Sequence, residues 1–344
     1  MIRFNNDYCC GAHPLILKAF ERTNPERYPG YGVDDWCAKA AGMIREAAGV
    51  PEAAVFFFPG ATQANFVVAA AALASTESVI AADTGHISCH ECASVENTGH
   101  KVLTLPNADG KLTAEAVESC ARRYVESGEA EYITRPAMVY LSFPTESGTL
   151  YSRAELEAIS AVCRRYGMLL FVDGARMSYG LMSEANDLTL KDFGRLADVF
   201  YLGGTKCGAM FGEAVVITRP ALARRFKARM KQNGAVLAKG WVLGLQFCTL
   251  LEGGLYFDIA KKADEQAMRI RRAFLGRGFA MSGSSPTNQQ FVLLGEEQKR
   301  ALARKYIFED EGAVRGGLSV VRFCTSWSTS DAEVDELVAD IAGL

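Results

Sequence analysis

The sequence predicts an α/β protein built on a mostly parallel sheet, because short apolar strands alternate with helical segments from residue 54 onward. Two segments in the middle of this alternation are wholly apolar, Met168 to Val172 and Val199 to Leu202. Such runs are typical of strands buried on both faces of a parallel sheet. Chains that alternate strand and helix in this way cover both faces of the sheet with helices.

The composition is that of a soluble globular protein. The chain has 344 residues, of which 49% are hydrophobic and 22% charged, with a net charge of −3. This length suits one large domain with a smaller partner, and the charge suggests neither nucleic acid nor a membrane as a partner. The N-terminus lacks the apolar core of a signal peptide, and ten cysteines fit a reducing compartment, so we expect a cytoplasmic protein.

The elements of the large domain are expected in the following order. Residues 1–30 contain several glycines and prolines and are predicted to form an irregular N-terminal arm, followed by a helix over 36–48. The predicted strands are 54–58, 78–82, 101–105, 137–143, 168–172, 199–202 and 213–218, and the helices among them are 62–74, 88–96, 114–125 and 153–166. These segments predict a seven-stranded sheet in a large domain over residues 31–250.

From Pro220 the pattern changes to longer helical segments. Helices are predicted over 221–230, 237–251 and 256–275, strands over 289–294 and 319–324, and a closing helix over 330–341. We therefore expect a small α/β domain over residues 251–344.

The two apolar strands end in groups that suit one cofactor. Asp173 follows the first strand, and Lys206 follows the second in the turn Gly203-Gly204-Thr205-Lys206. Open α/β sheets bind ligands at the carboxyl ends of their strands. Pyridoxal phosphate (PLP) needs a lysine for its Schiff base and an acid facing its ring nitrogen. The pair therefore predicts a PLP site, although either residue alone would also fit a structural role.

Other polar residues follow predicted strand ends. The turn before Thr62 opens a helix, whose free N–H groups could bind the cofactor phosphate. His86 could lie flat on the cofactor ring, and Glu146 could act as a base. Arg322, in an apolar strand, could bind an amino-acid carboxylate in bidentate fashion. A structural histidine, a loop acid and an edge-strand arginine are the simpler alternatives.

One cluster leads to a different hypothesis. His86, Cys89, His90 and Cys92 combine a Cys-x-x-Cys spacing with two histidines, which could bind zinc or respond to oxidation. A second cysteine pair at ligand spacing is missing, so no metal site is expected. A metal- or redox-responsive binding protein remains the alternative from another functional class.

Asp-Gly-Ala-Arg at 173–176 and Gly-Gly-Thr-Lys at 203–206 resemble the low-specificity L-threonine aldolases. These are PLP-dependent enzymes of the β-eliminating lyase group with the fold of type I PLP enzymes, the aspartate aminotransferase superfamily. The resemblance covers nearly the whole chain, and further segments match in order: Asn6-Asp7-Tyr8, Gly11-Ala12-His13-Pro14, Tyr31-Gly32-Val33-Asp34, Ala61 to Asn65, His86-Ile87 with Glu91, and Lys231-Gln232.

The resemblance implies a role for each matching residue. Lys206 would carry the cofactor, Asp173 would pair with its ring nitrogen, and Arg176 would lie beside its ring hydroxyl and near the substrate. Ala61, Thr62 and Thr205 would lie at the cofactor, with Thr62 holding the phosphate, and His86 would stack on the ring. Asn5 and Arg322 would hold the substrate carboxylate, and Tyr31 would reach the site from a neighbouring subunit.

The implied activity is aldol cleavage of L-threonine or L-allo-threonine to glycine and acetaldehyde by a homodimer or homotetramer. Another PLP-dependent β-elimination or an amino-acid transamination is the alternative on the same fold. Glu146 stands where many family members have a histidine, so the identity of the base stays open, as do the preferred threonine isomer and a role for Lys231 or Lys239 at the phosphate or a structural cation.

Overall fold

The computed structural model describes the backbone of residues 1–344 and all side chains except those of Ala313 and Arg315. Its centre is a seven-stranded sheet in the order β2-β8-β7-β6-β5-β3-β4. The strands are β2 (Ala54–Phe58), β3 (Glu77–Ala82), β4 (Lys101–Leu105), β5 (Arg135–Ser142), β6 (Leu169–Asp173), β7 (Val199–Gly203) and β8 (Glu213–Ile217). Only β8 runs against its neighbours, β2 and β7. The predicted fold class and all seven strands are confirmed.

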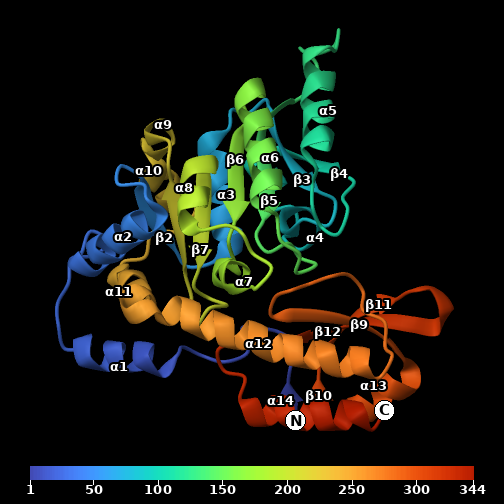
Figure 1. Ribbon diagram of the computed structural model, residues 1–344. Helices are drawn as coiled ribbons and strands as arrows, with labels where there is room; N and C mark the ends of the chain where they lie inside the picture. Colours follow the sequence, from blue (N-terminus) through green and yellow to red (C-terminus); the bar gives the residue numbers. More distant parts are fainter.

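Helices cover both faces of this sheet (Figure 1). One face packs on α3 (Ala61–Ala72) and α10 (Phe226–Gln232). The other packs on a larger set: α2 (Asp35–Ala48), α5 (Ala114–Val125), α6 (Arg153–Tyr166), α7 (Met177–Met182), α8 (Leu190–Leu196) and α11 (Trp241–Leu251). Every residue of β6 and β7 is therefore buried, which explains why both strands are apolar up to their functional ends.

A smaller antiparallel sheet lies beside the large one, in the order β11-β12-β9. Its strands are β9 (Gln289–Gly295), β11 (Glu309–Ala313) and β12 (Leu318–Cys324), and its helices are α12 (Leu255–Gly276), α13 (Glu296–Leu302) and α14 (Asp331–Ala342). Figure 1 shows α12 running from beneath the large sheet to this smaller unit. The limits of the two domains stay a prediction.

The N-terminal arm is more regular than the sequence predicted, and its limits stay a prediction. Residues 1–30 contain β1 (Ile2–Arg3), which pairs in parallel with β10 (Tyr306–Ile307), and the helix α1 (Pro14–Thr23). Pro14 occupies the first turn of α1, where a missing N–H costs nothing. The proline that suggested irregular chain therefore begins a helix.

Two predicted helices are broken in the structure. The segment 88–96 contains only the end of α4 (His86–Cys89) and the start of a 3₁₀ turn (Glu96–Thr98), because Cys92 and Ala93 take positive φ values of 48° and 58°. The segment 221–230 is divided at Arg225, whose φ is 61°, into α9 (Pro220–Ala223) and α10. In addition, α11 begins at Trp241 rather than at residue 237.

The helical run from Trp241 to Gly276 is long and apolar enough to cross a membrane, by length and composition only. It changes direction at Gly253 and Gly254, which have positive φ values, and α11 and α12 make separate contacts on either side. α11 packs against α2 and α1, whereas α12 packs against α7, α14 and β9. These contacts are those of core helices in a folded domain.

Candidate active site

Polar side chains from both parts of the chain line one cleft of about 920 Å³. Thr62, His86, Glu146, Arg176 and Lys206 come from the carboxyl ends of the large sheet and the turns after them. Gln289, Glu311 and Arg322 come from the smaller sheet, and Tyr8 comes from the N-terminal segment. Asp173 lies in an adjoining cavity with His86, Glu146, Arg176 and Lys206. Most of the residues selected from the sequence thus meet at one place.

Asp173 ends β6 and is buried. Its Oδ2 accepts hydrogen bonds from Tyr140 Oη (2.5 Å) and Asn65 Nδ2 (3.1 Å), and its Oδ1 accepts one from Ala175 N (2.9 Å). Burial alone would raise the pKa of Asp173, but the charge of His86 and the bond from Tyr140 outweigh it and hold the pKa below its ordinary value. Asp173 is therefore a fixed carboxylate.

Lys206 follows β7 in a turn that approaches the Asp173 turn very closely. A Cβ at Gly203 would lie 2.2 Å from the Ala175 carbonyl oxygen, and one at Gly174 would lie 1.8 Å from that of Tyr201. Only glycine fits at these two positions. Burial, followed by the charge of Arg176, lowers the pKa of Lys206. A larger fraction of its amine is therefore neutral and nucleophilic.

Glu213 holds the lysine turn in place and was not selected from the sequence. Its Oε1 accepts from Thr205 Oγ1 (2.7 Å) and its Oε2 from Gly204 N (3.1 Å), while Thr205 Oγ1 accepts from Gly212 N (3.0 Å). Burial raises the pKa of Glu213 to about 8. The signal that could have identified it is a carboxylate at the start of the otherwise apolar strand β8.

Gly60, Ala61 and Thr62 border the cleft at the N-terminus of α3. First-turn N–H groups have no partner within a helix, and the helix dipole favours an anion there. The Thr62 hydroxyl adds a donor. This arrangement fits the phosphate that the sequence predicted at this turn.

His86 is held at the cleft by a network behind it. Its Nδ1 lies 2.7 Å from Glu91 Oε1, and Glu91 also accepts hydrogen bonds from Asn65 (2.7 Å) and Ser94 (2.7 Å). Burial would lower the pKa of His86, but the contact with Glu91 and the charge of Asp173 raise it. Asn65 bonds both Glu91 and Asp173, so the imidazole and the buried acid are positioned by the same amide.

Glu146 presents one oxygen to the protein. Its Oε1 accepts hydrogen bonds from His86 N (2.8 Å) and Ser142 Oγ (2.6 Å). Burial disfavours the charged form and raises the pKa of Glu146. A carboxylate with a raised pKa beside Lys206 is suited to exchanging protons.

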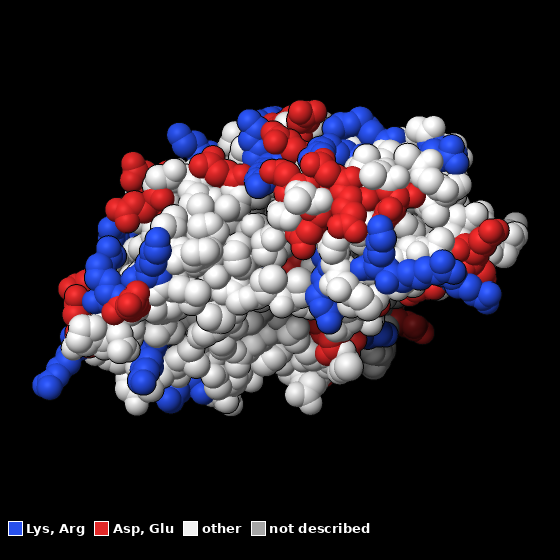
Figure 2. All heavy atoms as spheres, turned by 90° about the horizontal axis from the view of Figure 1, so that it is seen from below, with Lys and Arg blue, Asp and Glu red and all other residues white. Residues whose placement is uncertain are grey.

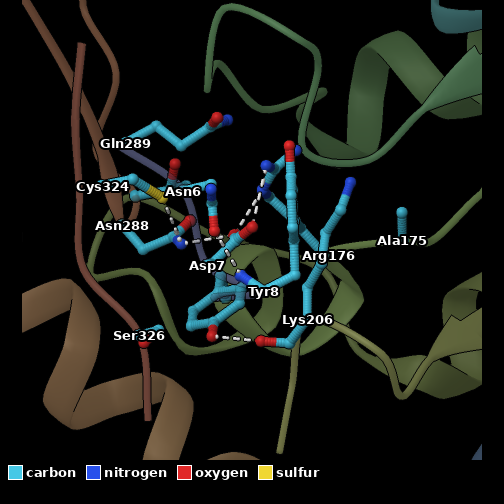
Figure 3. Close-up of polar contacts among 12 residues, drawn as sticks. Asn6, Asp7, Tyr8, Ala175, Arg176, Lys206, Asn288, Gln289, Cys324 and Ser326 are labelled. Atoms are coloured by element: carbon cyan, nitrogen blue, oxygen red, sulfur yellow. Dashed lines mark hydrogen bonds and ion pairs between the residues drawn. The ribbon is translucent and has the colours of Figure 1, made fainter. Parts of the chain in front are cut away.

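Arg176 forms an ion pair with Asp7, a residue that the sequence did not identify as part of the site. Asp7 accepts hydrogen bonds from Arg176 Nε (2.7 Å) and Nη2 (3.1 Å), and one from Asn288 Nδ2 (2.9 Å). Figure 3 shows Asp7 lying between these two side chains. Burial would raise the pKa of Asp7, but Arg176 and Lys206 lower it. The N-terminal segment thus joins the large sheet to the small one at the site.

The three remaining predicted substrate contacts differ in their placement. Arg322 lines the cleft, and Asn5 meets it through its main chain, accepting a hydrogen bond from Arg322 Nη2 (3.1 Å). Tyr31 is 52% exposed and borders a separate cavity, and Lys231 Nζ lies 5.0 Å from its ring centroid. A contribution of Tyr31 to the site of another subunit stays a prediction.

The His/Cys cluster lacks metal-site geometry. Among the described side chains, no group of three or more His, Cys, Asp or Glu is arranged to hold a metal ion. His86 is bound to Glu91, and Cys89 Sγ donates to the Asp83 carbonyl oxygen (2.8 Å). The donor set as a whole fits PLP: a buried acid, a desolvated lysine, an imidazole and an anion-binding helix N-terminus converge on one cleft.

Known proteins resemble this chain over nearly its whole length. The sequence model of the family described as β-eliminating lyase matches residues 28–297. A low specificity L-threonine aldolase from a Pseudomonas species is 32% identical, over 98% of this chain and 96% of the relative. The solved structure of a threonine aldolase from Leishmania major is 40% identical, with a TM-score of 0.96 over 99% of this chain and 98% of that one.

The fold extends to a wider group. An aspartate aminotransferase from Thermus thermophilus is 16% identical, with a TM-score of 0.72 over all of this chain and 91% of that one. At this identity the likeness concerns the fold alone.

Proposed function

The chain belongs to the β-eliminating lyase family, and we propose that it is a PLP-dependent aldolase that cleaves L-threonine and L-allo-threonine to glycine and acetaldehyde. One observation carries the proposal. A desolvated Lys206 and a fixed Asp173 carboxylate stand at the ends of neighbouring strands, beside a cleft that is also lined by Arg322 from the smaller sheet. This arrangement is suited to an amino acid activated by PLP.

Each residue has a definite task in this reaction. Lys206 would hold the cofactor covalently, Asp173 would pair with its ring nitrogen, Ala61 and Thr62 would bind its phosphate, and His86 would lie along its ring. When bound, the cofactor supplies an electron sink for the pair released from the broken Cα–Cβ bond. Arg322 binds the substrate carboxylate and so fixes the orientation of that bond.

The proton on the β-hydroxyl has a nearby acceptor. Glu146 Oε1 already accepts two hydrogen bonds, so Oε2 is the oxygen available to take this proton. As the proton leaves, the β-carbon becomes the aldehyde carbonyl and the Cα–Cβ bond breaks. A proton delivered to Cα then completes glycine.

We also propose that the protein is a cytoplasmic homodimer or homotetramer with its sites at subunit interfaces. Figure 2 shows a broad area without Lys, Arg, Asp or Glu on the underside of the molecule. Large exposed apolar residues in the N-terminal segment include Tyr8, Leu15, Leu17 and Val33. An area without charged side chains, together with exposed apolar side chains in the N-terminal segment, supports an interface, and ten free cysteines support a reducing compartment.

The test is a direct assay of the purified protein with PLP and each threonine isomer. We expect glycine and acetaldehyde in equal amounts, and no turnover from Lys206→Ala. Lys101→Ala, which changes an exposed lysine on the edge strand β4, is the control. A protein that binds PLP but leaves both isomers intact would show that the reaction is a different one.

A further inference from the structure

Arg322 already has an anionic partner within the protein. Its Nη1 lies 3.1 Å from Glu311 Oε1, and its Nη2 donates to the Asn5 carbonyl oxygen at 3.1 Å. Its Nε is buried without a hydrogen-bond partner. Both Arg322 and Glu311 line the active-site cleft. The guanidinium is therefore partly occupied by a carboxylate that is not the substrate's.

Bidentate capture of a carboxylate needs two parallel N–H groups of the guanidinium. Because Glu311 contacts Nη1, the two Nη groups of Arg322 cannot together bind a second carboxylate while that contact lasts. Nε has no partner but is buried, so a ligand in the cleft must use the Nη groups, of which Nη1 is held by Glu311. A substrate carboxylate therefore competes with Glu311 for Arg322.

We propose that Glu311 is a specificity-determining residue that occupies Arg322 in the ligand-free protein and is displaced by the carboxylate of the substrate. The inference rests on the proposed function, because it assigns Arg322 to that carboxylate. The displacement depends on whether the ligand carries a carboxylate. Binding of an amino acid must break the Glu311 contact, whereas binding of an amine without a carboxylate leaves it intact.

The position of Glu311 permits this displacement. Its side chain is 35% exposed, whereas that of Arg322 is only 18% exposed, so the glutamate can turn into solvent and the arginine stays in the wall. The pairing of β11 with β12 shifts in register between Asp310 and Gly312, and Gly312 has a φ of 108°. Glu311 therefore sits at the irregularity of an edge strand, where pairing constrains the chain least.

Neighbouring acids on the same strand provide matched comparisons. Glu309 is the residue directly opposite Arg322 in the β11–β12 pairing and also lines the cleft, but the ion pair is made by Glu311. Asp310 instead bonds Lys299 Nζ at 2.8 Å, away from the cleft. Asp310→Asn thus removes a β11 carboxylate without touching Arg322.

The experiment measures ligand affinity of the PLP-loaded enzyme from the absorption change of the cofactor. The ligands are glycine, which has a carboxylate, and ethanolamine, which has none. The proteins are the wild type, Glu311→Gln, Glu311→Ala and the control Asp310→Asn. Two replacements are needed because glutamine retains a neutral hydrogen-bonding group, whereas alanine removes it.

Partly exposed ion pairs are weak, so loss of the competitor should tighten glycine binding about two- to fivefold in both Glu311 variants. Ethanolamine affinity should be unchanged, and Asp310→Asn should match the wild type with both ligands. Unchanged glycine affinity in the Glu311 variants would overturn the proposal. Weaker glycine binding would also overturn it, by showing that Glu311 positions Arg322 for the substrate.

Failure of the proposed function would look different. In that case the wild type itself would bind PLP but would neither respond to glycine nor cleave threonine. If only the role of Glu311 is wrong, the wild type still binds glycine and cleaves threonine, and Glu311→Gln and Glu311→Ala simply fail to bind glycine more tightly than the wild type.

Discussion

Replacing Glu146 with glutamine tests the assignment of the base. Glutamine keeps an oxygen that can accept the bonds now made by His86 N and Ser142 Oγ, so the loop after β5 should keep its conformation. The amide cannot accept the proton of the β-hydroxyl. We therefore expect kcat for threonine cleavage to fall with little change in KM.

The size of the effect follows from the position of the carboxylate. Glu146 is half-buried, desolvation raises its pKa, and its Oε1 already accepts hydrogen bonds from two donors. Removal of a positioned general base costs about 10²- to 10⁴-fold in rate. The structure offers His86 as a nearby substitute, but its Nδ1 is held by Glu91.

The pH profile supplies a second readout. A base works only when deprotonated, so wild-type kcat should fall as pH drops through the raised pKa of Glu146, at a higher pH than for an ordinary glutamate. This limb should vanish in Glu146→Gln and persist in Ser142→Ala, which removes one hydrogen bond but leaves the carboxylate. A kcat for Glu146→Gln within about twofold of wild type, well short of the general-base range, would refute the assignment.

Three further predictions concern the same cleft. Asp173→Asn should lower kcat severely while the protein stays folded, measured by steady-state kinetics and circular dichroism, because an amide lacks the charge that holds the ring-nitrogen proton. Arg322→Ala should raise KM for threonine strongly but leave the absorption spectrum of the bound cofactor unchanged, since Arg322 comes from the smaller sheet and would bind the substrate rather than the cofactor; an unaltered KM would mark a structural arginine. Burial raises the pKa of Glu213 from 4.5 to about 8, so the folded protein retains this proton over a range where the unfolded chain loses it. The free energy of unfolding of the wild type should therefore decline relative to that of Glu213→Gln as pH rises through that interval, by about 1.4 kcal/mol per pH unit at most. A difference in unfolding free energy between the two proteins that stays constant with pH, measured by denaturant titration, would contradict this.

Much of the fold was readable from the sequence because it depends on local patterns. The seven strands of the large sheet were recognised as apolar runs, and the helices 114–125 and 153–166 match α5 and α6. Asp173 and Lys206 were recognised because both follow buried strands, where open α/β sheets bind ligands, and because the pair suits one cofactor. The hydrophobic periodicity predicted continuous helices over 88–96 and 221–230, and both predictions are wrong because Cys92, Ala93 and Arg225 take positive φ values. The local sequence pattern does not indicate these values.

The partners of the functional groups were decided by tertiary structure alone. Asp7 meets Arg176 and Asn288, and Glu311 meets Arg322, through contacts that depend on how the N-terminal segment and the small sheet pack against the large one. Residue types and spacings thus determined which side chains stand at the ends of the strands. Packing determined which charges are paired, which are desolvated and which remain available to a substrate, because those properties arise from neighbours that lie far apart in the chain.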